Sequence, residues 1–180
     1  MFPRLETERL LLRELTYEDA AGIFACFSNA DVTRYYGQET LERLEQAAAF
    51  VELFARNYEE KRGIRWGIQL KDSPDNRIMG TIGFNAWMPK HRRAEIGYEL
   101  HPDHWHKGYA TEAVSRIVAY GFEQLELARI GAVVFRENQA SQTLLTKLGF
   151  QQEGILRDYI VQDGKSYDTH VYSMLRHSSK

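Results

Sequence analysis

Three consecutive stretches between residues 64 and 100 alternate apolar and polar positions with a period of two. They are Ile64–Leu70, Arg77–Trp87 and Arg93–Leu100, and each has the length and pattern of a β-strand. The segment KDSPDN joins the first two through turn-forming residues, and MPKHR separates the second from the third. Short connections return each strand beside the previous one. The sequence therefore predicts an antiparallel meander in the middle of the chain.

The residues before this meander predict one strand and two helices. Glu8–Glu14 is a short Leu-rich run and predicts a strand. Thr16 and Asp19 have the spacing of a capping box that opens a helix. Thr40–Arg62 carries apolar residues on one broad helical face, and Asp31–Gly37 is too irregular to assign.

The residues after the meander predict two helices and three strands. Gly108–Leu125 and Gln139–Leu148 have helical periodicity, with the strand Arg129–Phe135 between them. From Phe150 two strands follow, joined at Asp163–Gly164, a pair typical of a type I′ hairpin turn. This order predicts one α+β domain over residues 1–180, with a mixed, mostly antiparallel sheet of about seven strands and about four helices.

Composition excludes several classes of protein. The 23 Lys and Arg residues nearly balance the 25 Asp and Glu residues, so the net charge of −2 gives no general reason to bind nucleic acid. The lone Cys26 forms no internal disulfide, and no apolar run reaches the roughly 20 residues that cross a bilayer. We expect a cytoplasmic protein with neither nucleic acid nor membrane as a partner.

The stretch AEIGYELHPDHWHKGYATEA joins the third meander strand to a helix. Gly108 and Ala110 place small residues on the first turn, where free N–H groups and a partial positive charge favour an anion. Lys107 adds a charge and Thr111 a hydroxyl. The pattern predicts a phosphate site, although glycine before a helix also serves as simple punctuation. It is neither a P-loop nor a dinucleotide fingerprint, because GK[ST] and G-x-G-x-x-G are absent.

The stretch FRENQASQTLLTKLGF joins a strand to a short helix. Asn138 is well placed to cap this helix, Ser141 falls on its first turn, and Gly149 ends it. Half of this motif could therefore be purely architectural.

Together, the two stretches resemble the GNAT superfamily of acyl-CoA-dependent N-acetyltransferases. HKGYATEA precedes a helix, and NQAS and the closing LGF follow about thirty residues later. LETERLLLREL, AEIGYEL and DGKSYDTHVYSML are similar to the branch with the Rim-type ribosomal-protein N-terminal acetyltransferases. The resemblance runs from Arg4 to Arg176 in the right order. It implies a GNAT-like fold in which a splayed strand pair forms the acetyl-CoA cleft.

The resemblance also implies which residues bind acetyl-CoA. Leu100, at the end of the splayed strand, would pair with the pantetheine arm, and Asn138 would hydrogen-bond it. Where the family has Gln or Arg three residues before the first glycine, this chain has Trp105, as is common in this branch. The backbone amides implied to hold the pyrophosphate are those of His106, Lys107, Gly108, Tyr109, Ala110 and Thr111.

Catalysis needs a proton donor and a base. In the Rim-like branch the serine that matches Ser141 protonates the leaving thiolate. Alternation along the third meander strand places Glu95 and Glu99 on one face. Glu95 matches a position where several GNAT enzymes keep a base and is the first choice, with Glu99 or a water relay as alternatives. Both carboxylates could instead face water or pair with Arg92 or Arg93.

Two further groups of residues bear on binding. His101, His104 and His106 share one loop, but a zinc site usually adds a Cys or a carboxylate in register, so we expect no metal. Aromatic residues that could line an acceptor pocket are Tyr35, Tyr36, Trp87 and Tyr159.

The sequence thus predicts an acetyl-CoA-dependent N-acetyltransferase that acts on a primary amine by direct attack in a ternary complex. By analogy with the Rim-like branch, the expected acceptor is a protein N-terminus of the ribosomal-protein kind. The alternatives are a small-molecule amine (a polyamine, amino acid or antibiotic) and a non-catalytic CoA-binding sensor. A homodimer is compatible with either activity.

Overall fold

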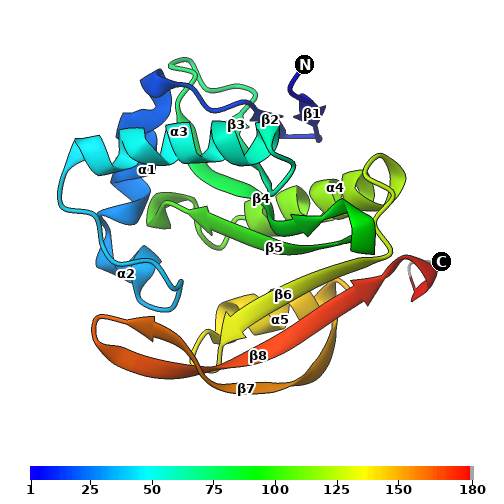
Figure 1. Ribbon diagram of the computed structural model, residues 1–180. Coiled ribbons are helices and arrows are strands. Elements are labelled where there is room, and N and C mark those ends of the chain that lie inside the picture. Colours follow the sequence, from blue (N-terminus) through cyan, green and yellow to red (C-terminus); the bar gives the residue numbers. More distant parts are fainter. Residues whose placement is uncertain (179–180) are drawn as a thin grey trace.

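The computed structural model describes residues 1–178 as one eight-stranded sheet with five α-helices (Figure 1). The strands are β1 (Leu5–Glu6), β2 (Leu10–Arg13), β3 (Ile64–Leu70), β4 (Ile78–Met88), β5 (Arg93–Leu100), β6 (Arg129–Phe135), β7 (Gln151–Gln162) and β8 (Lys165–Leu175). The helices are α1 (Ala20–Phe27), α2 (Ala30–Thr33), α3 (Leu44–Glu59), α4 (Tyr109–Glu123) and α5 (Gln139–Lys147).

The sheet has the order β1-β2-β3-β4-β5-β6-β8-β7. Every neighbouring pair is antiparallel except β5 and β6, which are parallel and are joined by the crossover helix α4. The predicted α+β class, meander and single parallel crossover are confirmed. The strand and helix counts each exceed the expected number by one, because β1 and α2 are too short to leave a periodic pattern.

Several predicted boundaries agree closely with the structure, and one differs. Ile64–Leu70, Arg93–Leu100 and Arg129–Phe135 are confirmed as β3, β5 and β6. Helix α3 begins at Leu44 rather than near Thr40, because the Thr40 hydroxyl lies 2.6 Å from the Thr33 hydroxyl and does not cap the helix.

The helices cover the two faces of the sheet (Figure 1). α1 and α3 pack on one face, where they enclose a core that includes Ile23, Phe27 and Val51. α4 and α5 pack on the other face over the larger core, which contains the fully buried Trp66 and Phe84.

β5 and β6 separate soon after they pair. Their register runs only from Arg93 opposite Arg129 to Glu95 opposite Gly131. Beyond Glu95 the two strands diverge, and the second half of β5 keeps its pairing with β4 on the other side. The predicted splayed strand pair is therefore present, and its open end faces the turn before α4.

The hairpin at the end of the sheet has the predicted turn. Asp163 has a φ of 51° and Gly164 a φ of 74°, so both central residues are left-handed. This is the backbone that a type I′ turn requires, and it sets the register of β7 against β8.

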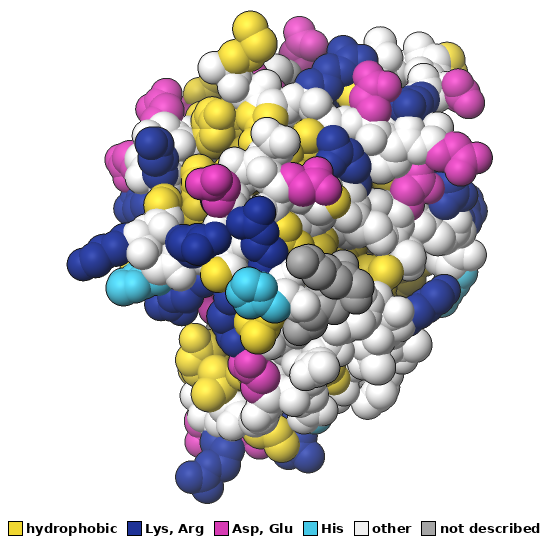
Figure 2. Space-filling model, turned by 90° about the vertical axis from the view of Figure 1, so that its right-hand side faces the viewer, with side chains coloured by type: hydrophobic (Ala, Val, Ile, Leu, Met, Phe, Trp, Pro, Cys, Tyr) yellow, Lys and Arg dark blue, Asp and Glu magenta, His cyan; other side chains and the backbone are white. Residues whose placement is uncertain are grey.

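Charges of both signs lie close together on the surface. Figure 2 shows the face at the right-hand side of Figure 1, where Lys and Arg side chains gather on one side with Asp and Glu side chains among and above them. Opposite charges that lie close together partly neutralise each other's electric fields. Within residues 1–178, no helix has the length and apolar character to span a membrane.

The close approach of β4 and β5 generates a stability prediction. A Cβ at Gly80 would lie 2.1 Å from the backbone oxygen of Glu99, whereas a Cβ at Gly154 on β7 would meet no atom within 4 Å. Because backbone must move to relieve such a clash, Gly80→Ala should lower the free energy of unfolding by about 3 kcal/mol. Gly154→Ala should change it by less than about 0.5 kcal/mol. Urea denaturation measures both changes, and equal effects would contradict the close approach of β4 and β5 at Gly80.

Candidate active site

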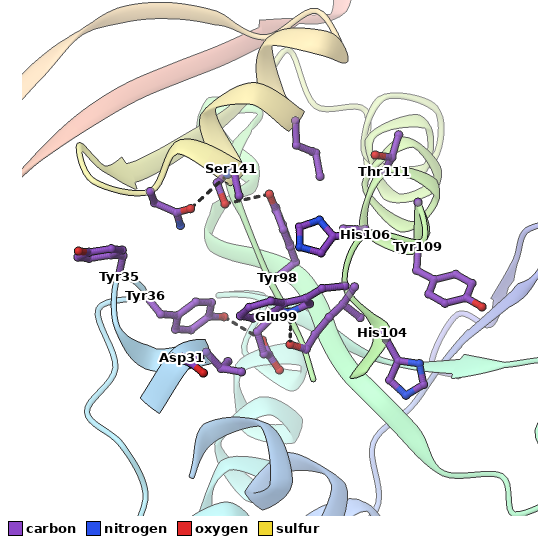
Figure 3. A pocket seen from close by; sticks show the side chains of 18 residues that line it. Asp31, Tyr35, Tyr36, Tyr98, Glu99, His104, His106, Tyr109, Thr111 and Ser141 are labelled. Atoms are coloured by element: carbon purple, nitrogen blue, oxygen red, sulfur yellow. Dashed lines mark hydrogen bonds between the residues drawn. The ribbon is translucent and has the colours of Figure 1, made fainter. Parts of the chain in front are cut away.

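A cavity of about 340 Å³ opens beside the end of β5, beyond the residues that pair with β6. Four parts of the chain surround it: the α2 segment, the end of β5, the turn before α4, and the first turn of α5 (Figure 3). The lining residues are Asp31, Val32, Tyr35, Tyr36, Tyr98, Glu99, Leu100, His104, Trp105, His106, Gly108, Tyr109, Ala110, Thr111, Asn138, Ala140, Ser141 and Leu144.

The turn before α4 presents backbone N–H groups at one end of this cavity. His106 and Gly108 are left-handed, with φ of 59° and 81°, and Gly108 is the N-cap of α4. The first N–H groups of a helix have no partner inside the helix. Because Gly108 and Ala110 are small, an anion can approach those groups closely. The turn therefore fits a pyrophosphate.

The predicted cofactor residues do not all face the cavity. Leu100, His106, Asn138 and the run Gly108–Thr111 line it. Lys107 is outside the lining, and its Nζ donates to the carbonyl oxygen of Asp103 at 2.8 Å. The side chain of Lys107 thus stabilises the loop, and only its backbone stays close to the proposed anion site.

Trp105 closes the end of β5. Its indole Nε1 donates to the carbonyl oxygen of Leu100 at 2.8 Å. The chain thus has an aromatic hydrogen-bond donor at the position where the GNAT superfamily, which its sequence resembles, has Gln or Arg. This bond holds the turn against the strand and fixes the direction of the Leu100 carbonyl.

Asn138 and Ser141 form the other side of the cavity. The side-chain oxygen of Asn138 accepts the Ser141 N–H at 3.2 Å, which is the capping role that its position predicted. That leaves the amide nitrogen of Asn138 as the atom free to contact a ligand. The hydroxyl of Ser141 accepts a hydrogen bond from the Tyr98 hydroxyl at 3.1 Å, and Figure 3 shows the two side chains pointing toward each other. Burial raises the pKa of the Tyr98 phenol, so it stays protonated and donates.

A second cavity of about 230 Å³ adjoins the first. The two share Tyr35, Tyr36, Tyr98, Asn138 and Ser141. The second cavity adds Glu95 and Asn85 from the sheet and Tyr159 and Ile160 from β7. Glu95 and Ser141 thus line one space, although they come from different elements. Of the four aromatic residues suggested for an acceptor pocket, Trp87 does not line it and packs against the larger core instead.

Glu99 is in a different environment from Glu95. Its side chain is 1% exposed, and its Oε2 lies 2.6 Å from Nη2 of Arg65. The Thr81 hydroxyl donates to its other oxygen at 2.5 Å, and the Tyr36 hydroxyl donates to Oε2 at 3.0 Å. Burial raises the pKa of the Glu99 carboxyl, and these three partners oppose the shift. Glu99 pairs with Arg65 rather than with Arg92 or Arg93. With both oxygens engaged, it is a poorer candidate for the base than Glu95.

A buried glutamine connects the end of β7 to α2 and the segment that follows it. Gln162, at the end of β7, is 3% exposed. Its side-chain oxygen accepts the Gly37 N–H at 2.9 Å, and its nitrogen donates to the Thr33 carbonyl at 2.6 Å. The irregular segment after α2 is therefore attached to the β7–β8 hairpin.

The three histidines of the loop have separate environments. His101 Nδ1 accepts the Asp103 N–H at 3.2 Å, the His104 ring lies 6.2 Å from the Tyr109 ring, and His106 lines the first cavity. In the part of the chain that the structure describes, no group of three or more His, Cys, Asp or Glu side chains is arranged to hold a metal ion.

Comparison with known proteins identifies the family. Residues 9–151 match the acetyltransferase (GNAT) domain. The chain belongs to the GNAT acetyltransferase family. The GNAT chain is 58% identical over 176 residues to the uncharacterised N-acetyltransferase YoaA of Bacillus subtilis (strain 168), covering 98% of both proteins. This chain is therefore an N-acetyltransferase.

Two other similarities bear on the fold and the branch. YdaF of Bacillus subtilis (strain 168), named "putative ribosomal N-acetyltransferase", is 31% identical over 121 residues, which is 67% of this GNAT chain and 64% of YdaF. RimL, a ribosomal L7/L12 alpha-N-protein acetyltransferase solved in complex with coenzyme A, superposes with a TM-score of 0.86. It covers 96% of this chain and 98% of its own, at 17% identity, and so shows the common fold alone.

Sequence reasoning missed three contributors to the site. Alternation along β5 puts Tyr98 on the face opposite Glu95 and Glu99, and the structure shows it at the junction of the two cavities. Arg65 and Gln162 reach partners 34 and 129 residues away. For Arg65, its place within the otherwise apolar strand β3 was the available signal, since buried polar groups need partners.

The buried Arg65–Glu99 pair generates a second stability prediction. Glu99→Gln leaves the guanidinium of Arg65 buried without a counter-charge, so the free energy of unfolding should fall by about 3–5 kcal/mol. Glu6→Gln is the matched control, because Glu6 pairs with Lys71 at the surface and should lose less than about 1 kcal/mol. Chemical denaturation compares the two. A Glu99→Gln protein as stable as the control would show that the pair does not hold β3 and β5 together.

Proposed function

We propose that this enzyme transfers the acetyl group of acetyl-CoA to the N-terminal amine of a protein of the ribosomal kind, in the cytoplasm and by direct attack in a ternary complex. One observation carries the proposal. Glu95 and Ser141 line the same cavity, and that cavity adjoins the cleft that ends at the helix N-terminus. A base, a proton donor and an anion-binding turn thus surround one continuous space.

The proposed cofactor contacts come from two elements. Backbone N–H groups of the turn before α4 would hold the pyrophosphate, and the end of β5 with Asn138 would hold the pantetheine arm. Small residues on the turn and the splay of β5 from β6 support this assignment. The residues proposed to bind the cofactor are Leu100, His106, Lys107 through its backbone, Gly108, Tyr109, Ala110, Thr111 and Asn138.

The proposed chemistry divides between two side chains. Acetyl-CoA, when bound, supplies the thioester whose acetyl group is transferred. Glu95 accepts the proton that the ammonium group of the acceptor must lose before its nitrogen attacks. Ser141 gives its hydroxyl proton to the departing sulfur. The attacking nitrogen gives up its second proton, which restores the Ser141 hydroxyl through solvent, so that one C–N bond forms and one C–S bond breaks. Tyr98 donates to Ser141 Oγ, which leaves the proton of Ser141 free to point at the sulfur.

The lining of the second cavity supports an amine acceptor. Glu95 attracts a cation, and Tyr35, Tyr36 and Tyr159 line the same cavity, where aromatic rings can stabilise an ammonium group. The similarity to YdaF supports a protein N-terminus, and the equal identity of 31% to the spermidine N(1)-acetyltransferase of Escherichia coli (strain K12), over 148 residues, makes a small amine the second candidate. The residues from α2 and β7 that surround this cavity would contact the rest of the acceptor.

Glu95→Gln and Ser141→Ala test the two catalytic roles. Each should lower kcat by about 10²-fold or more, because proton transfer is worth about 10²–10⁴-fold. Neither should change the Kd for CoA measured by calorimetry. The assay follows free thiol released from acetyl-CoA in the presence of N-terminal peptides. Spermidine and single amino acids are tested separately as alternative acceptors. Unchanged rates in both variants would overturn the assigned roles.

The same panel distinguishes the other candidates. Acetylation of spermidine or another small amine without peptide acetylation would contradict the protein acceptor. Tight CoA binding, with no thiol released from acetyl-CoA in the presence of any acceptor, would show a sensor rather than an enzyme acting on these amines.

Tyr98→Phe tests the hydrogen bond to Ser141. Loss of the phenol removes one donor, and a net hydrogen bond of about 1 kcal/mol corresponds to a kcat that falls by roughly 5- to 10-fold. The Kd for CoA should stay unchanged. Tyr120→Phe is the control, because Tyr120 lies on α4, packs against Trp66 of β3 and does not line the cavity. Equal kcat values for both variants would show that Tyr98 does not act through Ser141.

A further inference from the structure

An arginine from the N-terminal segment reaches the turn before α4. Arg9 Nη1 donates to the carbonyl oxygen of Lys107 at 2.9 Å, and its guanidinium lies 4.4 Å from the centre of the Tyr109 ring. A Cβ at Gly108 would lie 3.3 Å from Arg9 Nη2. Arg9 thus contacts Lys107 and Tyr109 and lies next to Gly108 between them, although it does not line the cavity.

Glu112, one helical turn into α4, holds Arg9 in this place. Its Oε2 accepts Arg9 Nε at 2.7 Å, and its Oε1 accepts the backbone N–H of Arg9 at 2.8 Å. The Thr7 hydroxyl also hydrogen-bonds to Oε1 of Glu112. The carboxylate is 18% exposed and the arginine side chain 42% exposed. A carboxylate with three donors from one short segment has little freedom, and so the arginine that it holds is well ordered.

These contacts determine what the turn presents to a ligand. A carbonyl oxygen directed into an anion site would repel the anion, and Arg9 keeps the Lys107 carbonyl bound to a donor. The ring of Tyr109 stacks on the guanidinium, and Figure 3 shows it directed away from the middle of the cavity, toward the N-terminal segment. The small residues Gly108 and Ala110 therefore line the cavity beside a Tyr109 ring that is held to one side and a Lys107 carbonyl that is held by a donor.

We infer that Thr7, Arg9 and Glu112 position the turn 107–109 for the pyrophosphate of acetyl-CoA. They act through the backbone of the turn and are positioning residues, not catalytic ones. The inference rests on the proposed function of that turn as the cofactor site. It adds the N-terminal segment, about a hundred residues away in sequence, to the machinery that binds the cofactor.

Arg9→Ala is the decisive variant, and Arg116→Ala is its matched control. Arg116 lies on α4 and, like the Arg9–Glu112 pair, tethers the N-terminal segment to this helix, because its Nε donates to the Glu6 carbonyl at 3.2 Å. Its hydrogen bond in the structure is to Glu6 and not to the turn. Calorimetry at a temperature where each protein is folded should show a Kd for CoA about tenfold weaker in Arg9→Ala and unchanged in Arg116→Ala. Arg9→Lys keeps the charge but loses the fork, and should fall between wild type and Arg9→Ala.

Acetyl-pantetheine, which lacks the pyrophosphate and the nucleotide, separates positioning from general damage. The kcat/KM for acetyl-CoA should fall about tenfold in Arg9→Ala, while the kcat/KM for acetyl-pantetheine stays within twofold of wild type. Glu112→Gln should behave like Arg9→Ala, and the double variant should be no weaker than either single one.

Three results would overturn the inference. They are an unchanged Kd for CoA in Arg9→Ala, an equal weakening in Arg116→Ala, and a parallel loss with both thioesters. A wild-type protein that binds CoA but acetylates nothing contradicts the proposed function alone, and the calorimetric comparison then still decides the inference. A wild-type protein that does not bind CoA overturns both.

Discussion

The separation of β5 from β6 is the constraint on which the rest of the site depends. Two parallel strands that pair for three residues and then diverge leave backbone N–H and C=O groups that must find other partners. Trp105 satisfies the last carbonyl of β5. The opening also brings α5 and the turn before α4 to the same space, with Tyr98 and Ser141 between them. Without the divergence, the sheet would be continuous there.

Position along one strand gives two carboxylates opposite properties. Glu95 and Glu99 point to the same face of β5, as alternation requires. Glu99 lies where side chains from β3, β4 and the segment after α2 cover that face. Arg65, Thr81 and Tyr36 enclose it there. Glu95 lies where the strands begin to diverge, and a cavity remains next to it. Burial therefore converts one acid into a structural ion pair and leaves the other accessible for chemistry.

Local pattern accounts for most of the fold that the sequence predicted. β3, β5 and β6 are long enough for alternation to define them, and Asp163–Gly164 needs only its own backbone preference to form a turn. β1 and α2 escaped prediction because two and four residues are too few to display a period. The site divides in the same way. The turn before α4 and the cap at Asn138 are local motifs, whereas Arg65, Arg9 and Gln162 find their partners only after the sheet has assembled, and no spacing in the chain encodes those contacts.

The bond network of Gln162 has a consequence for how this family diversifies. One amide attaches the segment after α2 to the β7–β8 hairpin, and both parts line the second cavity, whereas the turn before α4 lines the first. Under the proposed function, the hairpin and this segment form a unit that surrounds the acceptor, and the turn that holds the pyrophosphate is not part of it. Substitutions in that unit reshape the space around the acceptor while leaving the thioester end intact. Selection can therefore exchange one acceptor for another in small steps, each of which keeps a working cofactor site.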